Sequence, residues 1–393
     1  MRRGLAAVMC SLLMAATCLL AGCGSGNSAP AGGVTAEEVR PYDLAIVYSA
    51  RANSAGDLSL AENYIRAAVE GSYQGNEGFL AGISTDGSPQ AFSGTLCLTE
   101  QNQRRRQDEV QQNIANILNA GWTAQTSESN IFDAFRRGNE QLGSQQATES
   151  QRPNLLLVFD SGISTNGPIN FSEEVTRNGL LDPEAFIQLL RESGDLAKFD
   201  NVDKVIWYGL GETADPQESP NDGTKAAMEN FYRSLFEAAG VEDVEFRPGS
   251  GRIATGEYPE VSVVNMPRIP LDEEGNPILL GDTLELDESS AEFQFEYDES
   301  NFTDEEAALE GMQEYINQLI DFPSLQVTIK GYTDTQGNED YNLSLSQRRA
   351  DTVKRLFVES GVSESQITAV GMGESSDYED DKQNRRVEIV FGE

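Results

Sequence analysis

Two oppositely charged side chains near the C-terminal end of this chain, Asp334 and Arg349, could together bind a small zwitterion. Asp334 follows Gly331-Tyr332-Thr333, and Arg349 lies fifteen positions further along the chain. A carboxylate accepts hydrogen bonds from an ammonium group, and a guanidinium can hold a carboxylate with two parallel hydrogen bonds. The pair therefore predicts a site for a ligand that carries both charges.

The flanking sequence predicts a strand, a loop and a helix that position this pair. Alternating apolar and polar residues indicate a half-buried strand over 325–330, which Gly331 would end, so that the aspartate lies in the next loop. Asn342 or Ser344 could cap the helix that follows. Arg349 would lie early in this helix, beside its apolar face.

Further elements complete a small α/β unit. We expect a strand over 293–297, a helix with apolar residues between 308 and 319, and a last strand over 387–391. The order is β-α-β-α-β, which implies helices on one face of a sheet. Arg385 and Arg386 precede the last strand, and adjacent strand residues point to opposite sides. At least one of these two arginines should therefore face away from the site.

The same residues carry a resemblance to a known family. The motif consists of Gly331-Tyr332-Thr333-Asp334, Gly337, Asn342-Leu343-Ser344-Leu345-Ser346-Gln347-Arg348-Arg349-Ala350 and Asn384-Arg385-Arg386-Val387. Over residues 283–393 the chain resembles the OmpA-like peptidoglycan-binding domain. The resemblance implies that Asp334 holds the ammonium group, and Arg349 the carboxylate, of diaminopimelate in the peptidoglycan stem peptide. The positions that it implies as supporting, lining or bordering the site are Thr333, Asn342, Arg386 and Asp298.

The N-terminal residues are typical of a secretion signal. Arg2 and Arg3 precede a short apolar run that ends in Leu20-Ala21-Gly22-Cys23. This tetrapeptide resembles a bacterial lipobox, which implies removal of residues 1–22 and lipid on Cys23. The protein would then be anchored on the extracytoplasmic side of a membrane, at the periplasmic face of an outer membrane or the outer face of a cytoplasmic one. An ordinary secretory signal is the alternative. Residues 23–39 are rich in small residues and predict a flexible tether.

Composition excludes several classes of function. The chain has 65 acidic and 28 basic residues, for a net charge of −37. Nucleic acid is therefore not an expected partner, because binding to phosphates needs a basic surface. The chain contains no histidine, the commonest general base and a common metal ligand. We therefore expect neither an enzyme nor a bound metal or other cofactor. Beyond Cys23, Cys97 is the one remaining cysteine, so no intramolecular disulfide is expected.

Residues 40–250 predict a second, larger α/β unit. Apolar runs over 44–48, 155–159 and 205–208 indicate buried strands, and Asp86-Gly87 indicates a hairpin turn between two further strands. Helical periodicity separates these runs, which predicts a doubly wound, mostly parallel sheet. The order of elements resembles a von Willebrand factor A-like domain. Residues 251–282 contain four prolines without sustained periodicity and predict an extended linker, with a turn at Gly275-Asn276-Pro277.

In active members of that family, side chains at the strand ends hold a divalent metal ion. The matching positions here are Ser49, Arg51, Asn53 and Asp160, with Thr126 or Ser127 as a further candidate. Ser49 stands where the family has an aspartate, and the positive charge of Arg51 would repel a metal ion. We therefore expect a degenerate, metal-free site in which Arg51 takes the place of the metal and pairs with Asp160. Both would lie at the rim where doubly wound sheets bind ligands.

These patterns together predict a lipid-anchored envelope protein that tethers a membrane to the cell wall, with the larger domain docking another envelope protein. The alternative is an adhesin or sensor whose larger domain binds an external ligand, with the wall grip only positioning it. An enzyme with Asp160 as base near Ser49 is a third hypothesis, which the missing histidine disfavours. A flagellar stator-type protein would need a transmembrane helix where this chain has its lipobox.

Overall fold

The computed structural model describes residues 40–118, 124–251, 259 and 262–392. The predicted signal, the tether and Cys23 lie outside the described residues. We refer to residues 40–250 as the N-terminal domain and to residues 283–393 as the C-terminal domain. Within the described part of the chain, no helix combines the length and the apolar character needed to cross a bilayer.

The N-terminal domain contains a six-stranded sheet in the order β5-β4-β1-β6-β7-β8. Its strands are β1 (Asp43–Tyr48), β4 (Gly78–Ser84), β5 (Ala91–Leu96), β6 (Asn154–Phe159), β7 (Lys204–Tyr208) and β8 (Val244–Arg247). β4 and β5 form an antiparallel hairpin, and the remaining neighbours are parallel. The predicted doubly wound, mostly parallel sheet and its hairpin are confirmed. A separate short pair, β2 (Ala50–Arg51) and β3 (Ser54–Ala55), follows β1.

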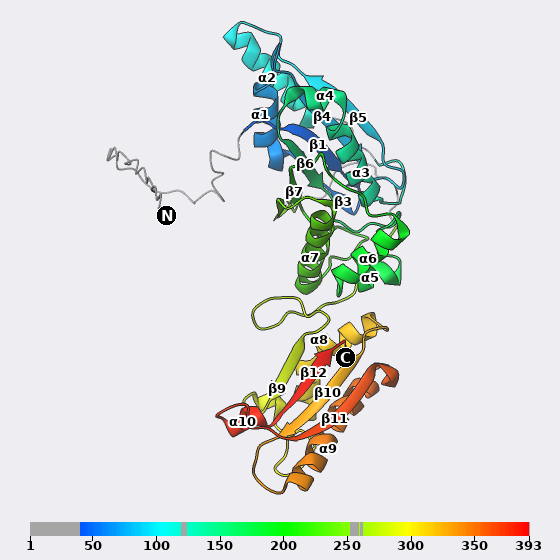
Figure 1. Ribbon diagram of the computed structural model, residues 1–393, viewed down its shortest axis with the longest axis vertical. Helices are drawn as coiled ribbons and strands as arrows, with labels where there is room; N and C mark the ends of the chain where they lie inside the picture. The colour runs from blue at the N-terminus through cyan, green and yellow to red at the C-terminus, as the bar shows by residue number, and fades with distance from the viewer. Residues whose placement is uncertain (1–39, 119–123, 252–258, 260–261, 393) are drawn as a thin grey trace, which may run out of the picture. The chain divides into compact units, whose positions relative to one another are not determined.

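Helices cover both faces of this sheet, because its central strands are apolar on both sides (Figure 1). In β1, Leu44 and Ile46 pack with one group of helices, while Ala45 and Val47 pack with the other. The first group comprises η2 (Leu58–Ala61), α1 (Glu62–Glu70) and α2 (Gln103–Leu118). The second comprises α3 (Ile131–Leu142), α4 (Gln145–Ser150), α6 (Pro183–Ser193) and α7 (Asp222–Ala239), and α5 (Glu174–Asn178) precedes α6.

The C-terminal domain is a two-layer α/β unit with a four-stranded sheet in the order β11-β10-β12-β9. Its strands are β9 (Thr283–Asp287), β10 (Val327–Thr333), β11 (Ile367–Glu374) and β12 (Arg386–Phe391). Its helices are η3 (Ala291–Phe293), α8 (Glu305–Asp321), α9 (Glu339–Glu359), η4 (Glu364–Gln366) and α10 (Asp381–Asn384). Val327 and Ile329 of β10 and Val387 and Ile389 of β12 are buried in the core that these elements share.

One strand prediction for this domain is wrong, and the strands β9 and β11 were not predicted. Residues 293–297 do not enter the sheet, although Phe293 and Phe295 alternate as a half-buried strand would. Phe295 instead stacks on Phe302 at 4.4 Å between ring centroids, in a loop that turns at Asp298. β9 takes the expected place of this strand. The parallel edge strand β11 was not predicted, because its two glycines and half-exposed residues hide the alternation.

Gly331 lies within β10 and does not end it, contrary to the sequence prediction. A Cβ atom at this position would lie 2.2 Å from the carbonyl oxygen of Ser346 in α9. At Gly371 of β11, a Cβ atom would lie 2.5 Å from the backbone nitrogen of Gln347. These two glycines therefore let α9 pack directly against the strands, which fixes the height of Arg349 above the sheet.

The described part of the predicted linker is extended but packed. The side-chain amide of Gln217 makes two hydrogen bonds with the backbone of Val264, and Thr224 accepts one from the Ile269 nitrogen. A turn is present just before the predicted position, at 272–275, with a hydrogen bond from the Gly275 nitrogen to the Asp272 carbonyl.

Candidate ligand-binding site

Four charged side chains of the C-terminal domain form a chain of alternating sign, which we call the charge cluster: Asp334, Arg385, Glu288 and Arg349. Asp334 Oδ2 lies 2.6 Å from Arg385 Nη1, and Arg385 Nε lies 2.5 Å from Glu288 Oε2. Glu288 Oε1 lies 3.5 Å from Arg349 Nη2. The fold thus brings the two residues of the sequence prediction to one place, with an ion pair between them.

Arg349 lies on the inner side of α9, and its side chain is only 3% exposed. It is therefore buried, and not beside the buried face as the sequence predicted. Its Nε donates to the Glu299 carbonyl at 3.2 Å, and its guanidinium lies 4.5 Å from the ring centroid of Phe295. Its Nη1 has no hydrogen-bond partner among the described residues. Burial lowers the pKa of Arg349, while the Glu288 carboxylate opposes this change.

An unpaired donor on a buried guanidinium is costly, because the desolvation of that group is not offset. An anionic ligand group would satisfy it.

Asp334 lies in the loop after β10, as predicted, although the strand extends further than expected and ends just before it; its side chain is 13% exposed. Besides its bond to Arg385, its Oδ1 accepts a hydrogen bond from the Gln336 nitrogen, which closes the loop. The pKa of Arg385 is raised: burial acts to lower it, but its hydrogen bonds to Glu288 and Asp334 outweigh that effect.

Asn342 and Thr333 are buried and support the site through hydrogen bonds. The Asn342 amide donates to the Gln336 carbonyl at 3.1 Å and to Glu374 Oε1 at 2.8 Å. Asn342 is buried within α9 and does not cap it, because Asn338 caps the helix through the Tyr341 nitrogen. The Thr333 hydroxyl donates to the Gly373 carbonyl, which ties β10 to β11.

Asp298 lies in an exposed loop beside the charge cluster. Its φ of 62° is in the left-handed region, and its carbonyl accepts a hydrogen bond from the Tyr341 hydroxyl at 3.3 Å. The backbone carbonyl of the next residue, Glu299, accepts the hydrogen bond from Arg349 Nε. This loop therefore contacts Arg349 and borders the charge cluster on one side.

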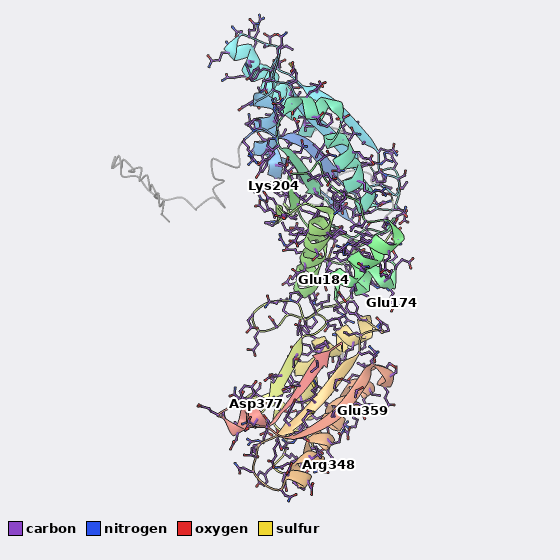
Figure 2. All side chains as sticks on the ribbon, viewed as in Figure 1. Glu174, Glu184, Lys204, Arg348, Glu359 and Asp377 are labelled. Atoms are coloured by element: carbon purple, nitrogen blue, oxygen red, sulfur yellow. The ribbon has the colours of Figure 1, made fainter. Side chains whose placement is uncertain are left out.

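Arg386 lies apart from the charge cluster. Val387 and Ile389 point into the core, so Arg386 and Glu388 alternate to the opposite face of β12. Arg386 pairs there with Asp377, labelled in Figure 2, at 2.9 Å, and lies 4.1 Å from the ring centroid of Tyr332. Of the two adjacent arginines, Arg385 contacts Asp334 and Arg386 faces away. The strand pattern left open which of the two arginines faces the site, whereas the family resemblance assigned the supporting position to Arg386.

Glu288 is the site residue that the sequence interpretation missed. It follows β9, which was not predicted, and it belongs to no motif. The alternating Thr-Leu-Glu-Leu-Asp of β9 is the signal that could have placed it, since a charged residue just after a strand lies at the rim of a sheet.

The rim of the N-terminal sheet holds a second polar site. Ser49 follows β1 and Asp160 follows β6, and these strands are paired, so the two residues lie side by side as predicted. A small pocket here is lined by Ser49, Arg51, Asn53, Ser127, Ser129, Asp160, Ser161, Ile163, Thr165 and Ser262. Thr126 lies next to it and donates to Asp86.

Arg51 fills this site, but its ion-pair partner is not the predicted one. Its guanidinium donates to the carbonyls of Ser127, Thr85 and Glu128, and it lies 3.5 Å from Asp86. Burial lowers the pKa of Arg51, and the negative charge of Asp160, which lies beyond ion-pair distance, opposes this change more than any other group does. The carbonyls of two loops turn the guanidinium towards Asp86, which the sequence interpretation treated only as a turn residue.

Burial raises the pKa of Asp160, while the Gly162 nitrogen, Arg51, Thr85 and Ser49 oppose that change. Across the described ranges no cluster of three or more acidic or cysteine side chains could hold a metal ion.

Comparison with known proteins identifies the C-terminal domain. Residues 294–389 match the OmpA family, so the chain carries an OmpA-family domain at its C-terminal end and that prediction is confirmed. A peptidoglycan-associated lipoprotein of Legionella pneumophila is 35% identical over 105 residues, which are 25% of this chain and 58% of the relative. The peptidoglycan-binding protein ArfA of Mycobacterium bovis is 39% identical over 87 residues, which are 20% of this chain and 27% of the relative.

Among solved structures, the peptidoglycan-associated lipoprotein from Burkholderia pseudomallei is similar, with 29% identity and a TM-score of 0.22. The match covers 25% of this chain and 86% of that one. This chain spans less than two thirds of the length of both sequence relatives.

Proposed function

We propose that the C-terminal domain binds peptidoglycan non-covalently by gripping diaminopimelate in its stem peptide. The observation that carries this proposal is the buried Arg349 guanidinium, whose Nη1 lacks a partner, in one cluster with Asp334. The names of the two sequence relatives, peptidoglycan-associated and peptidoglycan-binding, support it.

In this proposal each charged group has one role. Arg349 holds the carboxylate of the diaminopimelate side chain with charge-assisted hydrogen bonds, and Asp334 accepts hydrogen bonds from its ammonium group. Asn342 and Thr333 hold the loop that carries Asp334, and Asp298 borders the entrance. A lysine side chain presents the ammonium but no carboxylate, so it leaves Arg349 Nη1 unsatisfied. Binding of this kind involves no bond cleavage, and we propose no enzymatic activity.

We further propose that lipid on Cys23 anchors the protein to a membrane on its extracytoplasmic side. The chain would then tether that membrane to the cell wall. The lipobox-like Leu20-Ala21-Gly22-Cys23 supports the anchor, as does the occurrence of a lipoprotein among the relatives. With a net charge of −37, the protein would be repelled by an anionic bilayer, so the lipid must supply the attachment.

For the N-terminal domain we propose a von Willebrand factor A-like docking module for another envelope protein. The strand order and the polar rim at Ser49 and Asp160 support it, because doubly wound sheets bind ligands at this rim. Arg51, held by three carbonyls, favours docking that needs no metal ion. Capture of a secreted ligand instead of an envelope protein by residues 40–250 would favour the adhesin or sensor alternative.

Sedimentation with isolated peptidoglycan tests the wall grip. The wild-type protein should sediment with diaminopimelate-type peptidoglycan and only weakly with lysine-type peptidoglycan. Asp334→Ala should lose most of the sedimenting fraction, whereas Asp340→Ala, an exposed acid in the first turn of α9, should keep it. Equal sedimentation of wild type and Asp334→Ala would contradict the proposal.

A further inference from the structure

The charge cluster contains its own pair of opposite charges between the two gripping residues. Arg385 lies 2.6 Å from Asp334, and Glu288 lies 3.5 Å from Arg349. Arg385 and Glu288 are joined to each other at 2.5 Å. Seen from Asp334 and Arg349, this ion pair presents a cation to the carboxylate and an anion to the guanidinium, as a zwitterionic ligand would.

We infer that the Glu288–Arg385 ion pair is an internal substitute for the ligand, which occupies the grip in the free protein and is displaced on binding. This inference rests on the proposed function, since it concerns the same site. It assigns a role to two residues outside the predicted ligand contacts and makes Glu288 a determinant of specificity.

The contacts of Arg349 show why Glu288 must give way. Nε is bonded to the Glu299 carbonyl, so a ligand carboxylate that takes two hydrogen bonds must approach Nη1 and Nη2. Nη1 is unpartnered, but Nη2 already faces Glu288 Oε1 at 3.5 Å. Two carboxylates at one edge of a guanidinium repel each other, because like charges a few ångströms apart repel strongly at a site that is shielded from water. The Glu288 carboxylate therefore turns towards Arg385 alone when the ligand enters.

The same argument applies at the other end of the cluster. Asp334 Oδ2 is held by Arg385, and Oδ1 accepts the Gln336 nitrogen. A ligand ammonium group that bonds to Asp334 competes with the Arg385 guanidinium. Diaminopimelate supplies both charges, so it replaces both halves of the internal pair. A lysine side chain replaces only the cation and leaves Glu288 at Arg349, so diaminopimelate must displace more of the internal pair than lysine does.

The test is the double variant Glu288→Gln/Arg385→Gln, which removes both internal charges and leaves the net charge unchanged. Calorimetric titration with a synthetic tripeptide stem that contains diaminopimelate should give roughly tenfold tighter binding than wild type, because no internal pair has to be displaced. The matching lysine tripeptide should gain less, because it displaces only Arg385 in the wild type, so the preference for diaminopimelate should widen. Unchanged or weaker binding of the diaminopimelate peptide would overturn the inference, because the pair would then position the site and not occupy it.

A matched control is available in the same domain. Arg355 of α9 and Glu305 of α8 form an exposed ion pair at 2.6 Å, and Glu305→Gln/Arg355→Gln should bind like wild type. Thermal unfolding checks the fold, and Glu288→Gln alone, which should also bind more tightly, serves if the double variant unfolds. If neither wild type nor variant binds, the proposed function fails and the inference with it. If wild type binds and the variant binds no more tightly, the inference alone fails.

Discussion

Replacing Arg349 with glutamine should remove most of the affinity for diaminopimelate peptides. In the proposed complex the ligand carboxylate accepts two hydrogen bonds from Nη1 and Nη2 of a side chain that is 3% exposed. Hydrogen bonds to charged groups contribute about 1.5–3 kcal/mol each. Because Glu288 competes at Nη2, the lower value applies, and the two bonds together contribute about 3 kcal/mol. The expected loss in affinity is therefore roughly 150-fold.

The fold should tolerate this substitution. The variant loses the bond from Arg349 Nε to the Glu299 carbonyl and the contact with the Phe295 ring. Glu288 keeps Arg385 at 2.5 Å, so no buried carboxylate is left unpaired. The unsatisfied Nη1 disappears as well. We expect a cost of about 1–2 kcal/mol in the free energy of unfolding.

Arg348 provides the control, since it is the neighbouring residue of α9. It is exposed and donates to the Ser344 hydroxyl at 2.9 Å, and it contacts neither Glu288 nor Asp334 in the described hydrogen bonds and ion pairs. Arg348→Gln should bind the peptide as wild type does in calorimetric titration. An affinity of Arg349→Gln within threefold of wild type, with the fold intact, would refute the proposed role of Arg349.

Three further outcomes are expected. Cys23→Ser should release the protein from the membrane fraction, and persistent membrane association without a partner would contradict the anchor. Titration of residues 40–250 with magnesium or manganese should give no heat of binding, because Arg51 occupies the site between the two loops; micromolar affinity that Asp160→Ala abolishes would show that the site is active. Burial raises the pKa of Asp160 in the folded state. Between the ordinary pKa of an aspartate and this raised pKa, the folded state binds more protons than the unfolded state. The free energy of unfolding therefore falls as pH rises from the lower to the higher of these two values. Asp160→Asn should flatten that slope in denaturant titrations at several pH values, and an unchanged slope would show that this carboxyl does not cause it.

Much of the N-terminal fold could be predicted from sequence, because its central strands are buried on both faces. Continuous apolar runs such as 155–159 then stand out between helical patterns, and the position of Asp160 at the end of its strand follows directly. The partner of Arg51 could not be predicted, since it depends on where two loops place their carbonyls.

The C-terminal site was predictable where a motif carried it and not elsewhere. Asp334 and Arg349 belong to one motif, so their roles could be proposed before the fold was known. Glu288 depends on β9, whose short alternation competes with the stronger aromatic pattern of Phe293 and Phe295. Local pattern alone cannot decide between two such segments, because the decision rests on which one pairs with β12.

The close approach of α9 to the sheet has a consequence for mutational tolerance. A methyl group at Gly331 would lie 2.2 Å from a helix carbonyl, and one at Gly371 would lie 2.5 Å from a helix nitrogen. Any side chain there must lift the helix, and with it Arg349, away from Asp334. Two positions that never touch a ligand therefore limit how far this surface can be redesigned. New specificities would have to be sought in the exposed loop around Asp298.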